Sequence, residues 1–180
     1  MKPLDYAEKM CKTLMHKFTP EALPPAMGFH YHQGVFLNGM EQVYLKTGKQ
    51  EYADYIKNWV DLFISEDGDI SGSDHTQFDD LQPATLIFRL LSESGDEKYK
   101  KALDKILPLF KEWKRNEYGG FWHKEHYPNQ MWLDGLYMAG PLAIRYANLT
   151  GDKSYAEIPM KQMRLMWDYI RDQKTGLLYH

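Results

Sequence analysis

Three short segments of this chain resemble one another, and each has the pattern of a turn between two helices. They are TGKQEYADYI, SGDEKYKKAL and TGDKSYAEIP, whose glycines are Gly48, Gly95 and Gly151. A glycine that follows an apolar periodic run is typical of a helix C-terminal cap, and the polar residues behind it begin the next helix. A repeat of roughly fifty residues therefore predicts a series of helix–turn–helix units.

The two helices of each unit differ in their polarity. Behind Gly151, charged residues recur every three or four positions from Lys153 to Arg171, which is typical of one solvated face. Between Gln130 and Leu149 the only charged residues are Asp134 and Arg145, and apolar residues occur on all sides, as in a buried helix. Polar-backed outer helices thus alternate with enclosed inner ones. We expect an all-α fold of αα-hairpins, arranged as an open solenoid or a closed ring.

Composition excludes several classes of protein. With 180 residues, a formal net charge of −3 and one cysteine, Cys11, the chain lacks the basic charge of a nucleic-acid binder and cannot form an intrachain disulfide. The first residues, MKPLDYAEKMCKTLMH, hold no apolar core of signal-peptide length, and no apolar run of membrane-spanning length follows. We expect a single domain over residues 1–180 and a cytoplasmic location.

Three polar residues occupy equivalent places in the repeat. His32 and Asp79 each lie 16 residues before a turn glycine, and Asp134 lies 17 before one. If the inner helices run parallel, these side chains share one level of the fold. Packed helices lie about 8–10 Å apart, so two carboxyl groups at that level could flank one bond or one water.

Asp134 is the strongest catalytic candidate. It stands in MWLDGLYMAGP, and a carboxyl group in apolar surroundings favours its protonated form, as a general acid near neutral pH requires. The alternative is an acid in the first turn of a helix, where the dipole favours the ionised form. Asp79 has a similar alternative as an ordinary cap at the start of the helix FDDLQPATLIFRLL.

Histidines and aromatics recur in the loops MGFHYH (Met27–His32), GGFWH and TGLLYH. His123 and His126 have a spacing seen among zinc ligands, but no second ligand pair accompanies them, so we expect no metal. With Lys124, these loops fit an anionic or hydroxylated ligand better. The other interpretation is that they are loop residues bonded to backbone.

The segment GGFWHKEHYPNQMWLDGLYMAGPLAIRYA resembles the central signature of the unsaturated rhamnogalacturonyl hydrolases of glycoside hydrolase family 105, relatives of the unsaturated glucuronyl hydrolases of family 88. The segments YHQGVFLNGMEQVYLKTG, FDDLQPATLIFRLL and TGLLYH follow in family order. The resemblance implies an (α/α)6 toroid of about twice this length. Residues 1–180 would then form one toroid-type domain, truncated after its third hairpin, or about half of the ring.

The resemblance also implies a glycosidase activity in pectin degradation. The substrate would be an oligosaccharide left by a pectin or rhamnogalacturonan lyase, with a 4,5-unsaturated galacturonic acid at its non-reducing end. Hydration of the double bond would release a rhamnose-type product, without a metal or organic cofactor. Asp134 would protonate the double bond and then activate water. The implied substrate-binding residues are Tyr31, His32, Asp79, His123, Lys124, Glu125, His126, Tyr127 and His180.

Two alternatives stay open, a non-catalytic helical-repeat module that binds sugar or protein, and an inactive fragment of the hydrolase. A cut ring would expose apolar faces, for which Phe36, Met40, Tyr137, Met138 and Leu142 are candidates. We would then expect self-association or a C-terminal partner polypeptide at the cut edges, and poor activity of the chain alone.

Overall fold

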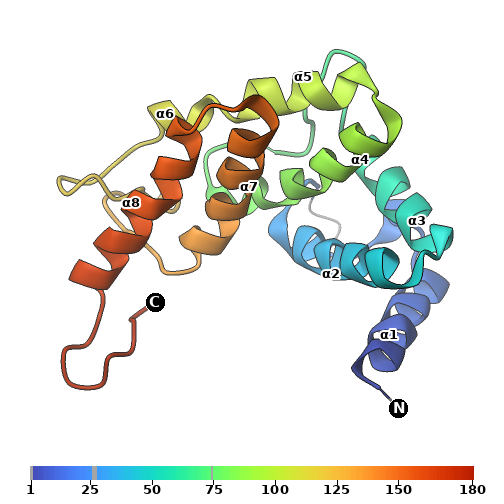
Figure 1. Cartoon of the computed structure of the whole chain (residues 1–180), viewed down its shortest axis with the longest axis horizontal. Coiled ribbons are helices and arrows are strands. Elements are labelled where there is room, and N and C mark those ends of the chain that lie inside the picture. The colour runs from blue at the N-terminus through green and yellow to red at the C-terminus, as the bar shows by residue number, and fades with distance from the viewer. Residues whose placement is uncertain (1, 26–27, 74) are drawn as a thin grey trace. The chain divides into compact units, whose positions relative to one another are not determined.

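The chain is helical over the residues that the structure, a computed structural model, describes: 2–25, 28–73 and 75–180 (Figure 1). Met27, the first residue of one aromatic loop, lies outside them. Within those ranges the only β-structure consists of isolated bridges, such as the one between Gln77 and Lys124. No helix there is long and apolar enough to cross a bilayer. The predicted all-α class is confirmed.

The chain divides into two compact units. The first comprises Met1–Ser73 and Pro83–Leu103, and the second comprises Asp74–Gln82 and Asp104–His180. The second unit therefore takes a short segment from within the sequence of the first. The elements η3 (Gln82–Leu86) and α5 (Glu97–Ile106) cross the boundaries between them.

The first unit contains α1 (Pro3–Lys17), η1 (Pro20–Ala22), α2 (Tyr31–Thr47), α3 (Gln50–Asp61) and α4 (Ile87–Ser94). Gly48 ends α2 and Gly95 ends α4, both in the left-handed region with φ of 67° and 66°, as the repeat predicts. The aromatic rings of Phe29 and Trp59 stack in its core with centroids 5.6 Å apart. Beside them, α3 packs against α2 as the second helix of a hairpin (Figure 1).

The second unit contains η2 (Phe78–Asp80), α6 (Leu109–Glu112), α7 (Gly135–Thr150) and α8 (Ser154–Tyr169). The turn at Gly151 joins α7 to α8, which lie side by side (Figure 1). Their approach is close, since a Cβ on Gly140 would lie 3.5 Å from Cβ of Pro159. Phe78 centres the aromatic core, stacked on Trp113 at 4.5 Å.

Two inner elements begin later than the sequence predicts. The helix expected from Asp79 onward is a pair of 3₁₀ segments, η2 and η3, and α-helix begins only at Ile87. Pro83 has no N–H to donate and its ring crowds the preceding turn, which favours the tighter 3₁₀ form. The buried helix expected from Gln130 begins at Gly135 as α7, because the Gln130 carbonyl accepts the N–H of His123 instead.

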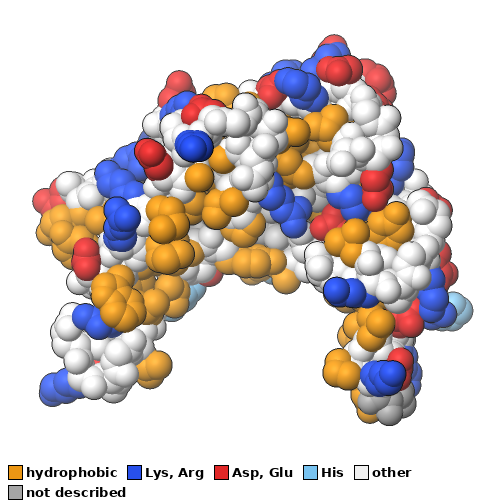
Figure 2. All heavy atoms as spheres, viewed as in Figure 1, with side chains coloured by type: hydrophobic (Ala, Val, Ile, Leu, Met, Phe, Trp, Pro, Cys, Tyr) orange, Lys and Arg blue, Asp and Glu red, His pale blue; other side chains and the backbone are white. Residues whose placement is uncertain are grey.

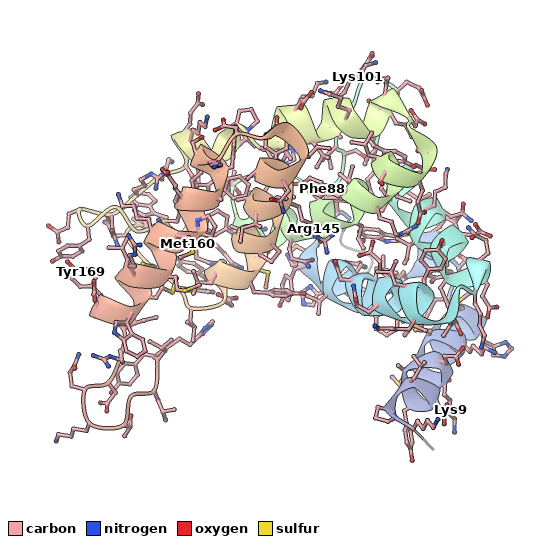
Figure 3. All side chains as sticks on the ribbon, in the orientation of Figure 1. Lys9, Phe88, Lys101, Arg145, Met160 and Tyr169 are labelled. Atoms are coloured by element: carbon pink, nitrogen blue, oxygen red, sulfur yellow. The ribbon has the colours of Figure 1, made fainter. Side chains whose placement is uncertain are left out.

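The expectation of exposed apolar side chains holds for only part of the residues named. Tyr137 is exposed as expected and Phe36 is half-buried, but Met40, Met138 and Leu142 are buried, since inner helices are covered by their neighbours. The outer helix α8 instead exposes apolar side chains over its length, visible in Figure 2 and, for the labelled Met160 and Tyr169, in Figure 3. The solvated face of α8 is therefore of mixed polarity.

Candidate active site

Two loop segments of the second unit are joined by backbone hydrogen bonds. The N–H of Phe78 donates to the His123 carbonyl at 3.2 Å, and the N–H of Glu125 donates to the Thr76 carbonyl at 2.9 Å. The side chain of Gln162, on α8, fixes the same loop by accepting the N–H of Phe121 at 2.9 Å. These bonds bring η2 beside the FWHKE segment, although the two are far apart in sequence.

The joined loops place His123 between two carboxyl groups. Nε2 of His123 lies 3.1 Å from Oδ1 of Asp79, and Nδ1 lies 3.4 Å from Oδ1 of Asp134. Lys124 completes the group, with Nζ 2.6 Å from Oδ2 of Asp79. The side chains of His123 and Asp79 are 1% and 4% exposed, whereas that of Asp134 is 34% exposed. Asp134 is thus the acid of this group that a ligand can reach.

The surroundings of Asp79 favour its ionised form. Burial raises the pKa of its carboxyl group, but the hydrogen bonds from His123 and Lys124 outweigh burial and lower the pKa to about 2. Asp79 therefore stays ionised at neutral pH. A buried charge of this kind requires its partners, and both carboxylate oxygens of Asp79 have one.

The carboxyl group of Asp134 does not cap its helix. Asp134 holds the N-cap position of α7, where its carbonyl accepts the N–H groups of Tyr137 and Met138, but its side chain makes no cap hydrogen bond. Oδ1 is buried and, among the described residues, has no hydrogen-bond partner. Asp79 is no cap either, because Gln77 holds that position of η2. Both acids point to His123, so the capping alternative does not describe what their side chains do.

Trp132 is a site residue that sequence analysis missed. Its indole stacks on the His123 ring with centroids 4.6 Å apart and an interplanar angle of 14°, and Tyr127 stacks nearby at 5.4 Å. The ring of His180 lies 5.6 Å from the same indole, and Nζ of Lys124 lies 5.6 Å from its centre. Trp132 thus gathers four residues predicted to bind substrate. The signal was present, since Trp132 directly precedes LDG in the motif around Asp134.

The other predicted binding residues lie elsewhere. Glu125 is exposed and pairs with Lys114 at 3.0 Å, beside a separate hollow lined in part by Trp113 and Trp122. His126 is exposed next to Tyr127.

Tyr31 and His32 belong to the first unit, where their rings stack at 4.1 Å and Nδ1 of His32 lies 2.8 Å from Nδ1 of His30. Their place beside Asp79 and Asp134 stays a prediction.

The donor set of the site argues against a resident cation. One ligand atom each from Asp79, His123 and Asp134 lie within 4.8 Å of one another, a spacing that an ion could use. The ammonium group of Lys124 already neutralises Asp79, however, and would repel a metal ion there. The arrangement fits a hydrogen-bonded chain of acid, imidazole and acid that handles protons.

The sequence of this chain also matches a known family. The sequence model of glycosyl hydrolase family 88 matches residues 6–180. This chain belongs to glycosyl hydrolase family 88. The family resemblance read from the FWHK and WLDGLYMAGP segments is thereby confirmed.

Similarity to individual proteins supports the assignment of this chain to family 88. The unsaturated rhamnogalacturonyl hydrolase YesR of Bacillus subtilis is 25% identical over the whole chain, which spans 53% of YesR. A family 105 glycoside hydrolase of Clostridium acetobutylicum (C. acetobutylicum ATCC 824) has a TM-score of 0.88 and 33% identity over 97% of this chain and 48% of its own. A possible family 105 member from Klebsiella pneumoniae has a TM-score of 0.77 and 27% identity, covering 86% of this chain and 40% of its own. The family 88 chain thus spans about half the length of these relatives, in αα-hairpins of the same fold.

Proposed function

We propose that the site of this chain hydrolyses unsaturated uronyl oligosaccharides of the kind that pectin and rhamnogalacturonan lyases leave. The observation that carries the proposal is the row of Asp79, His123 and Asp134, in which one acid is fixed as an anion and the other is accessible. Membership of family 88 and similarity to an unsaturated rhamnogalacturonyl hydrolase support this class of substrate.

The proposed reaction is a hydration of the 4,5-double bond. Asp134 donates its proton to C4, and positive charge develops at C5, where the ring oxygen shares it. Water then adds to C5 and returns one proton to Asp134, so one water is consumed and the carboxyl group is restored. The hemiketal at C5 opens to a ketone, which leaves the former ring oxygen as a hydroxyl on C1. The hemiacetal so formed at C1 collapses to an aldehyde: the bond from C1 to the glycosidic oxygen breaks, the proton of the C1 hydroxyl passes to that oxygen, and the neighbouring rhamnose-type sugar leaves. General acid and base catalysis of this kind contributes about 10²–10⁴ in rate.

The surrounding residues have supporting roles in this proposal. The anion of Asp79 stabilises the positive charge that develops on the sugar, since a carboxylate oxygen of Asp79 lies within 4.8 Å of one of Asp134. Lys124, with 24% of its side chain exposed, attracts the carboxylate of the uronic acid. The half-buried Trp132 indole leaves part of its apolar surface open to a sugar. The cytoplasmic location expected above also stays a prediction.

Replacement of Asp134 tests the proposal. Asp134→Asn should lower the rate at which the ultraviolet absorbance of the unsaturated uronate disappears by at least about 10²-fold, because the amide carries no acidic proton. Asp168→Asn, a matched change at an exposed position of α8, should keep the wild-type rate.

Near-normal turnover by Asp134→Asn would refute the role of Asp134. If the wild-type chain binds the unsaturated disaccharide by calorimetry without consuming it, the chain is the non-catalytic binding module considered above.

A further inference from the structure

His123 is the least exposed member of the site, and its two ring nitrogens face different acids. Its ring is covered by Trp132 on one face and meets Phe78 edge-on, with centroids 6.0 Å apart at 89°. An apolar cavity between α7 and α8 lies behind it, lined in part by Phe121, Ala139 and Met166. A ring that is 1% exposed offers no surface to a sugar. His123 must therefore act through the residues that it contacts.

We propose that His123 is a positioning residue that carries its proton on Nε2, presents an unprotonated Nδ1 to Asp134, and so keeps the catalytic proton on that carboxyl group. This inference rests on the proposed function and deepens it. It replaces direct substrate binding as the role of His123.

The tautomer follows from the anion on one side of the ring. Asp79 is ionised and can only accept, so Nε2 must donate its N–H across the 3.1 Å contact. A neutral imidazole carries one N–H, which leaves Nδ1 with a lone pair. The charged groups on this side are Asp79 and, bound to it, Lys124. The nearby carboxylate of Asp80 accepts hydrogen bonds from the side chain of Gln77.

The lone pair on Nδ1 of His123 determines whether the carboxyl group of Asp134 is favoured with or without its proton. Nδ1 of His123 and Oδ1 of Asp134 lie 3.4 Å apart, and both are buried without a hydrogen-bond partner in the described part of the chain. An ionised Asp134 would set two acceptors against each other, whereas a protonated Asp134 can donate its O–H to Nδ1. Buried acceptors without a donor are costly, so the protonated form is favoured.

The same contact serves the second half of the reaction. To give its proton to C4, the carboxyl group of Asp134 turns about its Cβ–Cγ bond, so that the O–H leaves Nδ1 and faces the sugar. The carboxylate that results again sets an oxygen against the lone pair of Nδ1. It is therefore a stronger base toward the attacking water, whose proton restores the starting state.

The tautomer can be measured without any substrate. In ¹⁵N spectra of the histidine-labelled chain at neutral pH, Nε2 of His123 should appear as a protonated ring nitrogen and Nδ1 as an unprotonated one. The signals are assigned by their loss in His123→Gln. A doubly protonated ring or the opposite tautomer would overturn the inference, whether or not the chain turns over substrate. Failure of the proposed function would instead show as no turnover with the expected tautomer intact.

Kinetics supply the second test. In His123→Gln an amide N–H can still donate to Asp79, but the rigid ring that holds an acceptor 3.4 Å from Asp134 is lost. We expect the alkaline limb of the kcat/KM profile to move to lower pH by about one unit, which is a tenfold loss on that limb, with KM within about twofold. His16→Gln, an exposed control on α1, should leave the profile unchanged.

An alkaline limb that stays in place in His123→Gln would refute the positioning role. If KM rises at the same time, His123 is a substrate contact after all. If kcat/KM falls by the same factor at every pH, the residue serves only to hold the loop in place.

Discussion

Asp79 alone should account for about 2 kcal/mol of the stability that this protein loses as pH drops from about 5 to about 2. Its pKa is about 2 in the folded chain against an ordinary value of 3.8, because hydrogen bonds from His123 and Lys124 outweigh burial. One pKa unit corresponds to about 1.4 kcal/mol. The folded state holds the ionised form more tightly, so this contribution is complete above the unfolded pKa and disappears as pH falls through the folded one.

Asp79→Asn should remove that contribution. The variant should be less stable than wild type by about 2 kcal/mol near pH 6, and the two should converge near pH 2. Urea unfolding followed by tryptophan fluorescence and far-ultraviolet circular dichroism at several pH values gives this gap directly. Other acids with lowered pKa, such as Asp61 and Asp172, titrate in both proteins and cancel in the comparison.

Asp168→Asn serves as the control, because this exposed carboxylate on α8 should leave the pH dependence of wild type intact. A gap between wild type and Asp79→Asn that stays constant from neutral to acidic pH would show that the Asp79 carboxylate is not held by His123 and Lys124 as described.

Two further predictions concern buried polar contacts, one in each unit. Glu41→Gln breaks the buried ion pair with Arg89, whose Nε lies 3.0 Å from Oε1, and should cost about 3 kcal/mol in urea unfolding; a cost below about 1 kcal/mol would contradict this. Gln162→Leu leaves the buried N–H of Phe121 without its acceptor and should cost about 1–3 kcal/mol. The amide of Phe121 should then exchange faster in hydrogen-exchange experiments, and unchanged protection would contradict the assignment.

The periodic features of the fold could be predicted from the sequence. Gly48, Gly95 and Gly151 end helices in the left-handed conformation because the signal for that ending is local. The 3₁₀ form of residues 78–86 was not predicted, although Pro83 could have suggested it. The apolar residues of FDDLQPATLIFRLL suggest one continuous helix, whereas proline lacks the N–H that an α-helix would use at that position.

The sequence predicted which residues belong to the site, with the exception of Trp132, but not how they contact one another. Spacing in the repeat pointed to Asp79 and Asp134. The histidine-containing aromatic loop pointed to His123 and Lys124, and the resemblance implied the same two residues. The contact between Asp79 and His123 depends on hydrogen bonds between two loops, and no helical or strand period encodes such pairing. Trp132 was missed because it counted only as part of the apolar surroundings of Asp134.

The second unit is built from two separate stretches of the chain, and this affects when the site can form during synthesis. Asp79 is made 44 residues before His123, and it belongs to a segment flanked on both sides by the first unit. Before the ribosome has added His123 and Lys124, Asp79 lacks both of its hydrogen-bond partners. The segment around Asp79 is therefore not yet stabilised in its final conformation. A nascent chain halted before that point should leave residues 75–82 open to proteases, whereas one released beyond Gly151 should protect them.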